Sequence, residues 1–250
     1  YWNRALVGVE IEKYFADYQQ NINDNTIYPE PMAQFDFNAT DILKNKAGNA
    51  YNLQTGTVTD NIYTQEDKNL ETIAGLNEED GAVHIRKGDA LQFNLDGTEN
   101  VNSFTMMWNV RIPDRSTYRS LLQTDNTNTA DSQMFIHEDG RIGRGSIFGY
   151  GGMVNLNTWH HIMLVVRNNV ACAYLDGVRV ASGFKANDVY TLREGKCLIF
   201  CDNDGEMADI DITQFAYWNR GLTNEEVSMH YANYKEHMTT AIEGIAAEDA

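Results

Sequence analysis

The sequence predicts an all-β protein built from antiparallel strands. Three observations support this class: apolar and polar residues alternate along several segments, Asp-Gly pairs separate those segments, and only one stretch has a clear helix start signal. Alternation with a period of two places successive side chains on opposite faces of a sheet, and Asp-Gly is a favoured pair in hairpin turns. Many short strands followed by a single helix indicate either a β-sandwich or a β-barrel.

The clearest strands lie in the middle of the chain. Residues 91–95 and 104–112 alternate apolar and polar side chains, which predicts antiparallel strands with one buried face. Residues 161–166 are more continuously apolar and predict a strand that is buried on both faces. Residues 171–180 consist of two apolar runs around an Asp-Gly pair, which predicts a hairpin. The predicted turns are at Asp96-Gly97, Asp139-Gly140, Asp176-Gly177 and Asp204-Gly205.

Two segments lack a strand pattern. Residues 60–80 are acidic and weakly patterned, so we expect a long surface excursion there. Residues 143–152 are rich in glycine but lack the lysine of a phosphate-binding loop, so we expect a flexible or bulged connection between strands.

One helix is predicted near the end of the chain. Thr223 and Glu226 have the spacing of a capping box, in which each side chain satisfies the backbone N–H of the other residue. Val227, Tyr231 and Tyr234 follow at intervals of four and three residues, so they lie on one face of the helix.

The first eighteen residues recur near the other end of the chain. Residues 1–18 align without a gap with residues 217–234, and eight of the eighteen positions are identical. Trp2 and Trp218 are equivalent in this alignment, so we expect both to pack a helix onto a sandwich. We interpret residues 1–20 as the terminal strand and helix of a preceding similar domain, 21–31 as a linker, 32–235 as one complete domain and 236–250 as a tail.

The composition restricts the classes of partner. The formal net charge is −17, and an acidic surface repels nucleic-acid phosphates and anionic lipids. No run of eighteen apolar residues is present, so no membrane insertion is expected. The three cysteines, an odd number, lack the spacing of a metal site. We expect buried thiols, and a bridge from Cys172 to Cys197 or Cys201 stays open.

Four segments are similar to one known family. Residues 159–183 resemble the core hairpin of laminin-G-like, concanavalin-A-like jelly-roll domains, and residues 210–227 resemble the closing strand and helix. Residues 88–113 and 32–53 resemble the early strands and the opening strand with its polar loop. The resemblance implies an antiparallel jelly-roll β-sandwich with a short C-terminal helix. Residues 239–250 resemble the lead-in to sorting segments of exported bacterial proteins, which implies an extracellular, cell-surface or periplasmic location.

Two loops have the composition of a carbohydrate site. Sugars present flat C–H faces and hydroxyl groups, so a site combines an exposed aromatic ring with amide or carboxylate groups. Loops on a rigid sandwich are frequent places for such sites. The candidate ligand-binding residues are Tyr118, Asp125, Asn126 and Asn128, with Asp131 nearby, in one region and Phe148 and Tyr150 in the other.

A cation site is the second candidate. Asp202, Asp204 and Glu206 occupy alternate positions around a glycine turn, and Ca²⁺ takes several oxygen ligands from such a bend. The glutamate that completes an EF-hand loop is missing, so an EF-hand is excluded. Calcium sites in similar domains imply one structural Ca²⁺ between this turn and the opening loop that contains Asp36. The alternative is a solvated acidic turn without an ion.

A glycosidase is the third hypothesis. Asp209 and Asp211 lie two positions apart on a predicted strand, so they share a face at a separation of about 6.7 Å. This distance alone does not exclude two-carboxylate chemistry. The resemblance to laminarinase-type enzymes implies a third acid on the same strand, but Thr213 and Gln214 occupy its positions. We therefore expect no catalytic activity.

These observations favour a non-catalytic recognition module in an exported or cell-surface bacterial protein. Its expected ligand is carbohydrate, its expected cofactor is at most a structural Ca²⁺, and its other partners are neighbouring domains of the same polypeptide. The alternative is a structural or protein–protein interaction domain that is ancillary to an enzyme.

Overall fold

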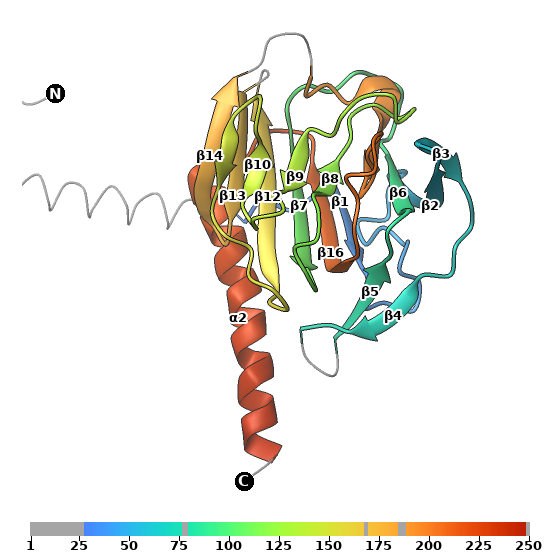
Figure 1. Cartoon of the computed structure of the whole chain (residues 1–250). Helices are drawn as coiled ribbons and strands as arrows, with labels where there is room; N and C mark the ends of the chain where they lie inside the picture. The colour runs from blue at the N-terminus through green and yellow to red at the C-terminus, as the bar shows by residue number, and fades with distance from the viewer. Residues whose placement is uncertain (1–27, 77–79, 168–169, 185–188, 249–250) are drawn as a thin grey trace, which may run out of the picture.

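The computed structural model describes residues 28–76, 80–167, 170–184 and 189–248, with side chains as far as Glu236. Two layers of antiparallel strands pack face to face, and one helix follows the last strand (Figure 1). The predicted all-β sandwich with a C-terminal helix is therefore confirmed. The expected terminal strand and helix of a preceding domain at residues 1–20, including Trp2, lie outside the described residues, as does most of the 21–31 linker.

The first layer is an eight-stranded sheet. Its strands are β1 (Ala33–Asp36), β4 (Glu71–Ala74), β5 (Gly81–Ile85), β7 (Phe104–Arg111), β12 (His160–Arg167), β13 (Val170–Leu175), β14 (Val178–Phe184) and β16 (Ile210–Trp218). Their order is β14-β13-β12-β7-β16-β5-β4, and β1 pairs with β16 beside the β5 segment. The Asp176-Gly177 turn joins β13 to β14 with positive φ at both residues, as a tight hairpin turn requires.

The second layer consists of two four-stranded sheets. Their strands are β2 (Asn52–Thr59), β3 (Ile62–Gln65), β6 (Asp89–Asn94), β8 (Arg119–Leu122), β9 (Met134–Ile136), β10 (Ile142–Arg144), β11 (Gly149–Gly151) and β15 (Lys196–Ile199). The orders are β11-β10-β9-β8 and β15-β6-β2-β3. A bridge between Gln123 and Leu198 joins the two sheets, because the backbone N–H of each residue donates to the carbonyl of the other.

Strands occur in both segments that lack a sequence pattern. The expected surface excursion at 60–80 contains β3 and β4, and the glycine-rich segment at 143–152 contains most of the β10–β11 hairpin. The side chains of β3 and β4 are largely exposed, because both strands lie at sheet edges. Such strands bury neither face, so no alternation of apolar residues marks them.

Aromatic rings join the two layers. Phe93 from β6 lies 5.1 Å from the ring centroids of both Phe215 and Tyr217 on β16 and 6.2 Å from that of Phe35 on β1. All four side chains are almost completely buried. Burial of such large apolar surfaces is the main stabilising contribution to a sandwich of this kind.

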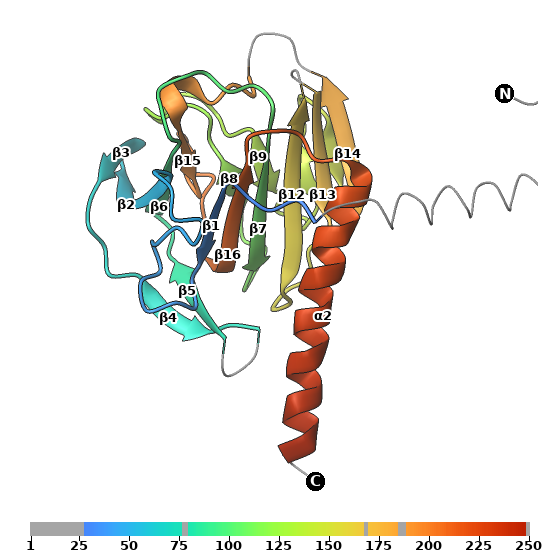
Figure 2. The ribbon, with the colours of Figure 1, turned by 180° about the vertical axis from the view of Figure 1, so that it is seen from behind.

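The outer face of the large sheet is buried as well. The sequence predicts one solvated face for residues 104–112, but every residue of β7 except Arg111 is buried. Helix α2 (Asn224–Glu248) packs there, and Met107, Met163 and Trp218 form a separate apolar cluster with helix residue Val227. Figure 2 shows α2 beside the strands β12 and β13. The prediction of a solvated face was wrong because alternation does not reveal what covers the second face.

The predicted helix start is confirmed. The Thr223 N–H donates to Glu226 Oε2 at 2.8 Å, and the Glu226 N–H donates to Thr223 Oγ1 at 3.2 Å. Trp218 has the expected packing role, and its indole N–H donates to the Pro29 carbonyl at 2.8 Å. The helix continues to Glu248, beyond residue 236, where the sequence predicts a tail. Among the described residues, no helix combines the length and apolar character that a bilayer crossing requires.

The three cysteines are buried free thiols, as predicted. Cys197 lies in the main core, Cys172 in the cluster under α2, and Cys201 in a third cluster with Ala90 and Leu198. Because the three thiols belong to separate clusters, the bridge that the sequence left open does not form. Burial raises the pKa of Cys197 and of Cys201 above the ordinary value, which keeps both in the unreactive thiol form.

The contact of Phe93 with four other rings, Tyr51 at 6.1 Å included, predicts a large effect of its removal. We expect Phe93→Ala to lower the free energy of unfolding by about 3–5 kcal/mol, because it leaves a cavity between the layers. Phe184→Ala is the matched control: Phe184 is 63% exposed, and its loss should change stability by less than about 0.5 kcal/mol. Urea denaturation measures both values, and equal effects of the two substitutions would contradict the assigned core.

Candidate functional site

Three partly exposed rings lie together on the β8–β11 sheet. Tyr118 precedes β8, His137 follows β9, and Tyr150 lies in β11. The centroid of His137 is 4.5 Å from that of Tyr118 and 4.6 Å from that of Tyr150, and the two tyrosine rings are 6.4 Å apart. We call Tyr118, His137 and Tyr150 the aromatic face.

The strand register explains why these rings meet. Phe135, Gly143 and Tyr150 are directly opposed on β9, β10 and β11. Gly143 has φ of +146°, and a Cβ atom there would lie only 2.1 Å from the carbonyl oxygen of Gly149. A glycine is therefore required at this position, and it leaves no side chain between Phe135 and Tyr150. Tyr118 packs on Phe135 with a centroid distance of 5.8 Å.

Charged groups surround the aromatic face. The Arg144 guanidinium lies 5.5 Å from the centroid of the Phe135 ring and forms an ion pair with Asp131. Burial and the negative charges of Glu138 and Glu206 raise the pKa of Tyr118, and burial is also the main cause of the raised pKa of Tyr150. Both phenols are thus neutral hydrogen-bonding groups beside carboxylates and a guanidinium.

Three carboxylates converge next to this face. Asp131, Asp202 and Glu206 each offer an oxygen atom, and these atoms lie within 4.8 Å of one another. Burial and the neighbouring Asp204 raise the pKa of Asp202 to about 7, and burial and the charges of Asp204 and Asp131 raise the pKa of Glu206. Three oxygen ligands with mutual repulsion fit a hard cation such as Ca²⁺, which completes its coordination with water or carbonyl oxygens.

The predicted metal ligands are only partly brought together. Asp202 and Glu206 belong to the group, whereas Asp204 does not. The Asp204 backbone N–H instead donates to Asp202 Oδ1 at 3.3 Å. The expectation for Asp36 was wrong, because its carboxylate lies on the outer face of the large sheet and accepts hydrogen bonds from Gln34 and Gln214.

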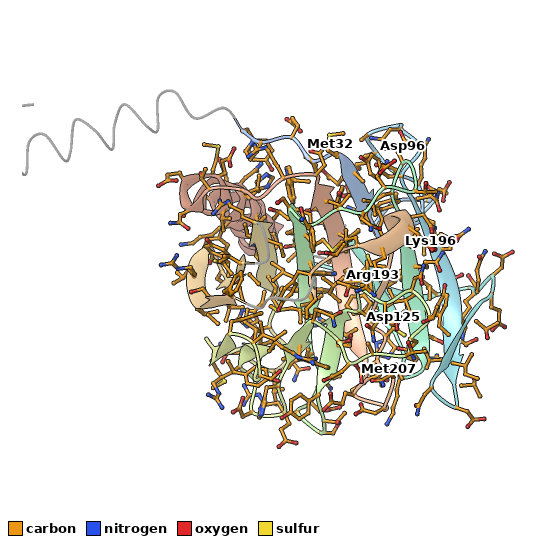
Figure 3. All side chains as sticks on the ribbon, turned by 90° about the horizontal axis from the view of Figure 1, so that it is seen from above. Met32, Asp96, Asp125, Arg193, Lys196 and Met207 are labelled. Atoms are coloured by element: carbon orange, nitrogen blue, oxygen red, sulfur yellow. The ribbon has the colours of Figure 1, made fainter. Side chains whose placement is uncertain are left out.

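Figure 3 shows this separation. Met32, just before β1, and Met207, just after Glu206, lie on different sides of the sandwich. The sequence could not reveal the separation, because it depends on the pairing of β1 with β16. The third carboxylate of the group, Asp131, lies outside the acidic turn, and the sequence indicates it only as a neighbour of the first loop.

The loop that begins at Asp125 is held by its own side chains. The Asp125 carboxylate accepts hydrogen bonds from the backbone and the hydroxyl groups of Thr127 and Thr129. Burial alone would raise the pKa of Asp125, but these hydrogen bonds more than offset it and the pKa is lowered.

The other residues of this loop have different positions. Asn128 has a φ of 57° and is only 2% exposed, and its amide donates to the carbonyls of Asn61 and Asp202. Its predicted ligand contact was therefore wrong, since both amide hydrogens hold the loop in place. Asn126 is half-buried, and its role as a ligand residue stays a prediction.

The two aromatic residues of the glycine-rich segment differ in environment. Phe148 packs at the edge of the core, 6.1 Å from the ring centroid of Tyr190, whereas Tyr150 belongs to the aromatic face. Phe148 is half-buried and packs against the core, and its role as a ligand residue stays a prediction. His137 is not among the residues that the sequence predicts for this site, because a lone histidine without a nearby motif does not indicate a ligand site. Its position just before the Asp139-Gly140 turn was the available signal.

The two candidate glycosidase acids form a structural network. The Asp211 carboxylate lies 2.7 Å from His84 Nδ1 and accepts a hydrogen bond of 2.9 Å from Arg111 Nε. Asp209 accepts a hydrogen bond of 2.8 Å from the Lys87 N–H. These bonds link β5, β7 and β16, so both carboxylates have structural partners.

The sequence matches one family model. The model described as "Concanavalin A-like lectin/glucanases superfamily" matches residues 87–228. Comparison with curated proteins found no match.

Several solved structures share the fold. Domain 4 of AbnA, a GH43 extracellular arabinanase from Geobacillus stearothermophilus determined in complex with arabinotriose, is 16% identical with a TM-score of 0.58 over 80% of this chain and 97% of that one. The binding domain of Paraclostridial Mosquitocidal Protein 1 is 17% identical, with a TM-score of 0.55 over 81% of this chain and 51% of that one. The botulinum neurotoxin serotype G binding domain is 12% identical, with a TM-score of 0.56 over 82% and 51% of the two chains. At these identities the similarity shows the fold alone.

The Asp211 network predicts that the Asp211 carboxylate stabilises the fold. Asp211→Asn keeps the size of the side chain but removes the charge that pairs with Arg111, so we expect a loss of about 1–3 kcal/mol in the free energy of unfolding. Asp209→Asn is the matched control, with an expected loss below about 1 kcal/mol because Asp209 is more exposed. If urea denaturation finds Asp211→Asn as stable as the unsubstituted protein, the network is not structural.

Proposed function

The chain belongs to the concanavalin A-like lectin/glucanases superfamily, and from this premise we propose that it is a non-catalytic recognition module that binds carbohydrate through the aromatic face. The observation that carries the proposal is the cluster of three partly exposed rings beside charged hydrogen-bonding groups. Aromatic rings receive the C–H faces of a sugar, while polar groups at their edges bind its hydroxyl groups.

The residues around the aromatic face suit this chemistry. Tyr118 and Tyr150 offer neutral phenol groups, and Arg144 and Asp131 provide a donor and an acceptor close to the rings. On the other side, Asp139 pairs with Arg141 next to His137. A sugar ring on this surface would therefore meet both stacking and hydrogen-bonding partners.

Two further observations support the proposal. One domain of similar fold was determined with arabinotriose bound, and the others are binding domains of toxins. Asp209 and Asp211 are engaged in structural contacts, and the third acid of the related enzymes is replaced by Thr213 and Gln214. A recognition role without catalysis agrees with both observations.

The proposal includes a structural Ca²⁺ at Asp131, Asp202 and Glu206. These carboxylates come from the loop after the Asp125 turn and from the acidic turn after β15, so an ion would tie two loops together. With a net charge of −17, the module repels nucleic acid and anionic membrane. We place it in an exported or cell-surface bacterial protein, with neighbouring domains of the same polypeptide as its other partners.

A glycan array followed by calorimetry tests carbohydrate binding. We expect Tyr118→Ala and Tyr150→Ala each to weaken binding about tenfold or more, equivalent to about 1.4 kcal/mol, because each removes a ring that stacks on the sugar. Tyr231→Ala on α2 is the control and should bind normally. The absence of binding to every polysaccharide, with and without Ca²⁺, would refute the proposal and favour the protein-interaction alternative.

Thermal unfolding with Ca²⁺ and with chelator tests the ion. At a free Ca²⁺ concentration of about 100 times Kd, the melting temperature should rise by roughly 5–10 °C. Glu206→Gln removes a ligand charge and should abolish most of this rise, whereas Glu138→Gln, at an exposed position outside the group, should preserve it. An identical melting temperature in millimolar Ca²⁺ and in chelator would exclude a structural calcium.

A further inference from the structure

A cavity of about 370 Å³ lies on the outer face of the large sheet, on the other layer from the aromatic face. Its floor consists of residues from β7, β12 and β16, and α2 forms one wall. The opening segment with Tyr28 and Pro31 forms a second wall, and residues near the start of β5 form a third. The volume lies within the range of small-molecule sites, roughly 300–1,000 Å³.

A row of polar residues crosses the floor of this cavity. His161 on β12 is directly opposite Asn109 on β7, Asn109 is opposite Gln214 on β16, and Gln214 is opposite Asp36 on β1. The neighbouring part of the same face is apolar and is covered by α2. Four adjacent strands therefore present polar side chains at the place where the helix packing ends.

Four buried polar atoms around this cavity have no hydrogen-bond partner within the described part of the chain. They are Asn109 Oδ1, His161 Nδ1, Thr213 Oγ1 and the Tyr234 hydroxyl. Each of these residues is at least nine-tenths buried. An unpaired buried polar group destabilises a protein, so native structures contain few of them. Their concentration around one cavity indicates that a bound molecule satisfies them.

The local structure explains why the polar atoms of Asn109 and Thr213 lack a partner in the protein. Its amide donates to Gln214 Oε1 at 3.2 Å, which leaves its oxygen as an acceptor. Thr213 lies at the bulge between Ile212 and Gln214, where the register between β16 and β7 shifts. The bulge introduces an extra residue into the strand, and the Thr213 side chain is directed to the cavity.

The unpaired groups of the lining are uncharged. Burial and the nearby His230 lower the pKa of His161 to about 3, and burial raises the pKa of Tyr234, so both are uncharged at neutral pH. Asp36 is paired with Lys46 and also accepts from Gln34 and Gln214. The unpaired atoms belong to an amide carbonyl, an imidazole and two hydroxyl groups. A ligand that satisfies all of them must both donate and accept hydrogen bonds, as a hydroxyl group does.

We propose that this cavity binds a small neutral molecule with several hydroxyl groups, such as a single monosaccharide unit or a polyol. Hydroxyl groups satisfy the four unpaired atoms, and Trp218 and Tyr28 supply apolar ring surface at the wall. The site shares no residue with the aromatic face, so the inference does not depend on the proposed function.

Conservative substitutions separate binding from folding. Thr213→Val and Tyr234→Phe each remove one hydroxyl group and preserve the shape of the side chain. Because the lost groups lack partners in the protein, we expect both variants to melt at or above the temperature of the unsubstituted chain. Tyr231→Phe, on the same helix but outside the cavity lining, is the matched control.

The full chain is titrated with D-glucose, D-galactose, L-arabinose and glycerol by calorimetry and by NMR of the side-chain amides of Asn109 and Gln214. We expect at least one of these probes to bind and to shift both amide signals. Thr213→Val and Tyr234→Phe should each weaken that binding about tenfold, whereas Tyr231→Phe should leave it unchanged.

Two results would overturn the inference. If none of the four probes shifts the Asn109 and Gln214 amides, the cavity holds only water, which also satisfies polar groups. If a probe binds and Tyr150→Ala weakens it while Thr213→Val and Tyr234→Phe do not, the sugar occupies the aromatic face. That second result would reject this cavity site and at the same time support the proposed function.

Discussion

The face-to-face packing of the two layers around β16 is the constraint on which the other features depend. This strand pairs with β7 on one side and with β5 and β1 on the other. Its inward side chains, Phe215 and Tyr217, meet Phe93 of the second layer. Its outward side chains include Gln214 and Trp218, which belong to the polar row and the apolar cluster under α2. The same alternation thus builds the core and the outer face.

A sandwich has two outer faces, and in this protein they differ in chemistry. The second layer presents the aromatic face and the acidic group, which are open to large molecules because the rings are partly exposed. Part of the first layer is covered by α2 and the opening segment, which form two walls of a half-open cavity. The layers are held together by the core and not by these two surfaces.

Part of the candidate site could be predicted from the sequence. Tyr118 and Tyr150 were both candidates, because aromatic residues in polar loops suggest a carbohydrate site. Their proximity depends on the β8–β11 sheet, whose strands of three or four residues have little pattern of their own. The predictions for Asn128 and Asp36 were wrong for a related reason: residue type does not show whether a polar side chain faces solvent or is already hydrogen-bonded within the protein. Both are polar, and both are buried.

The sequence by itself determined the features that depend on near neighbours. These are the strand alternation of residues 104–112, the Asp176-Gly177 hairpin and the Thr223–Glu226 helix cap, since each is set by interactions within a few residues. Only the tertiary structure decided which carboxylates converge and which polar atoms surround the cavity. Asp131 joins Asp202, and Asn109 joins Thr213, through strand pairings between distant parts of the chain. Pairing of this kind depends on the total burial of both layers, which no local pattern specifies.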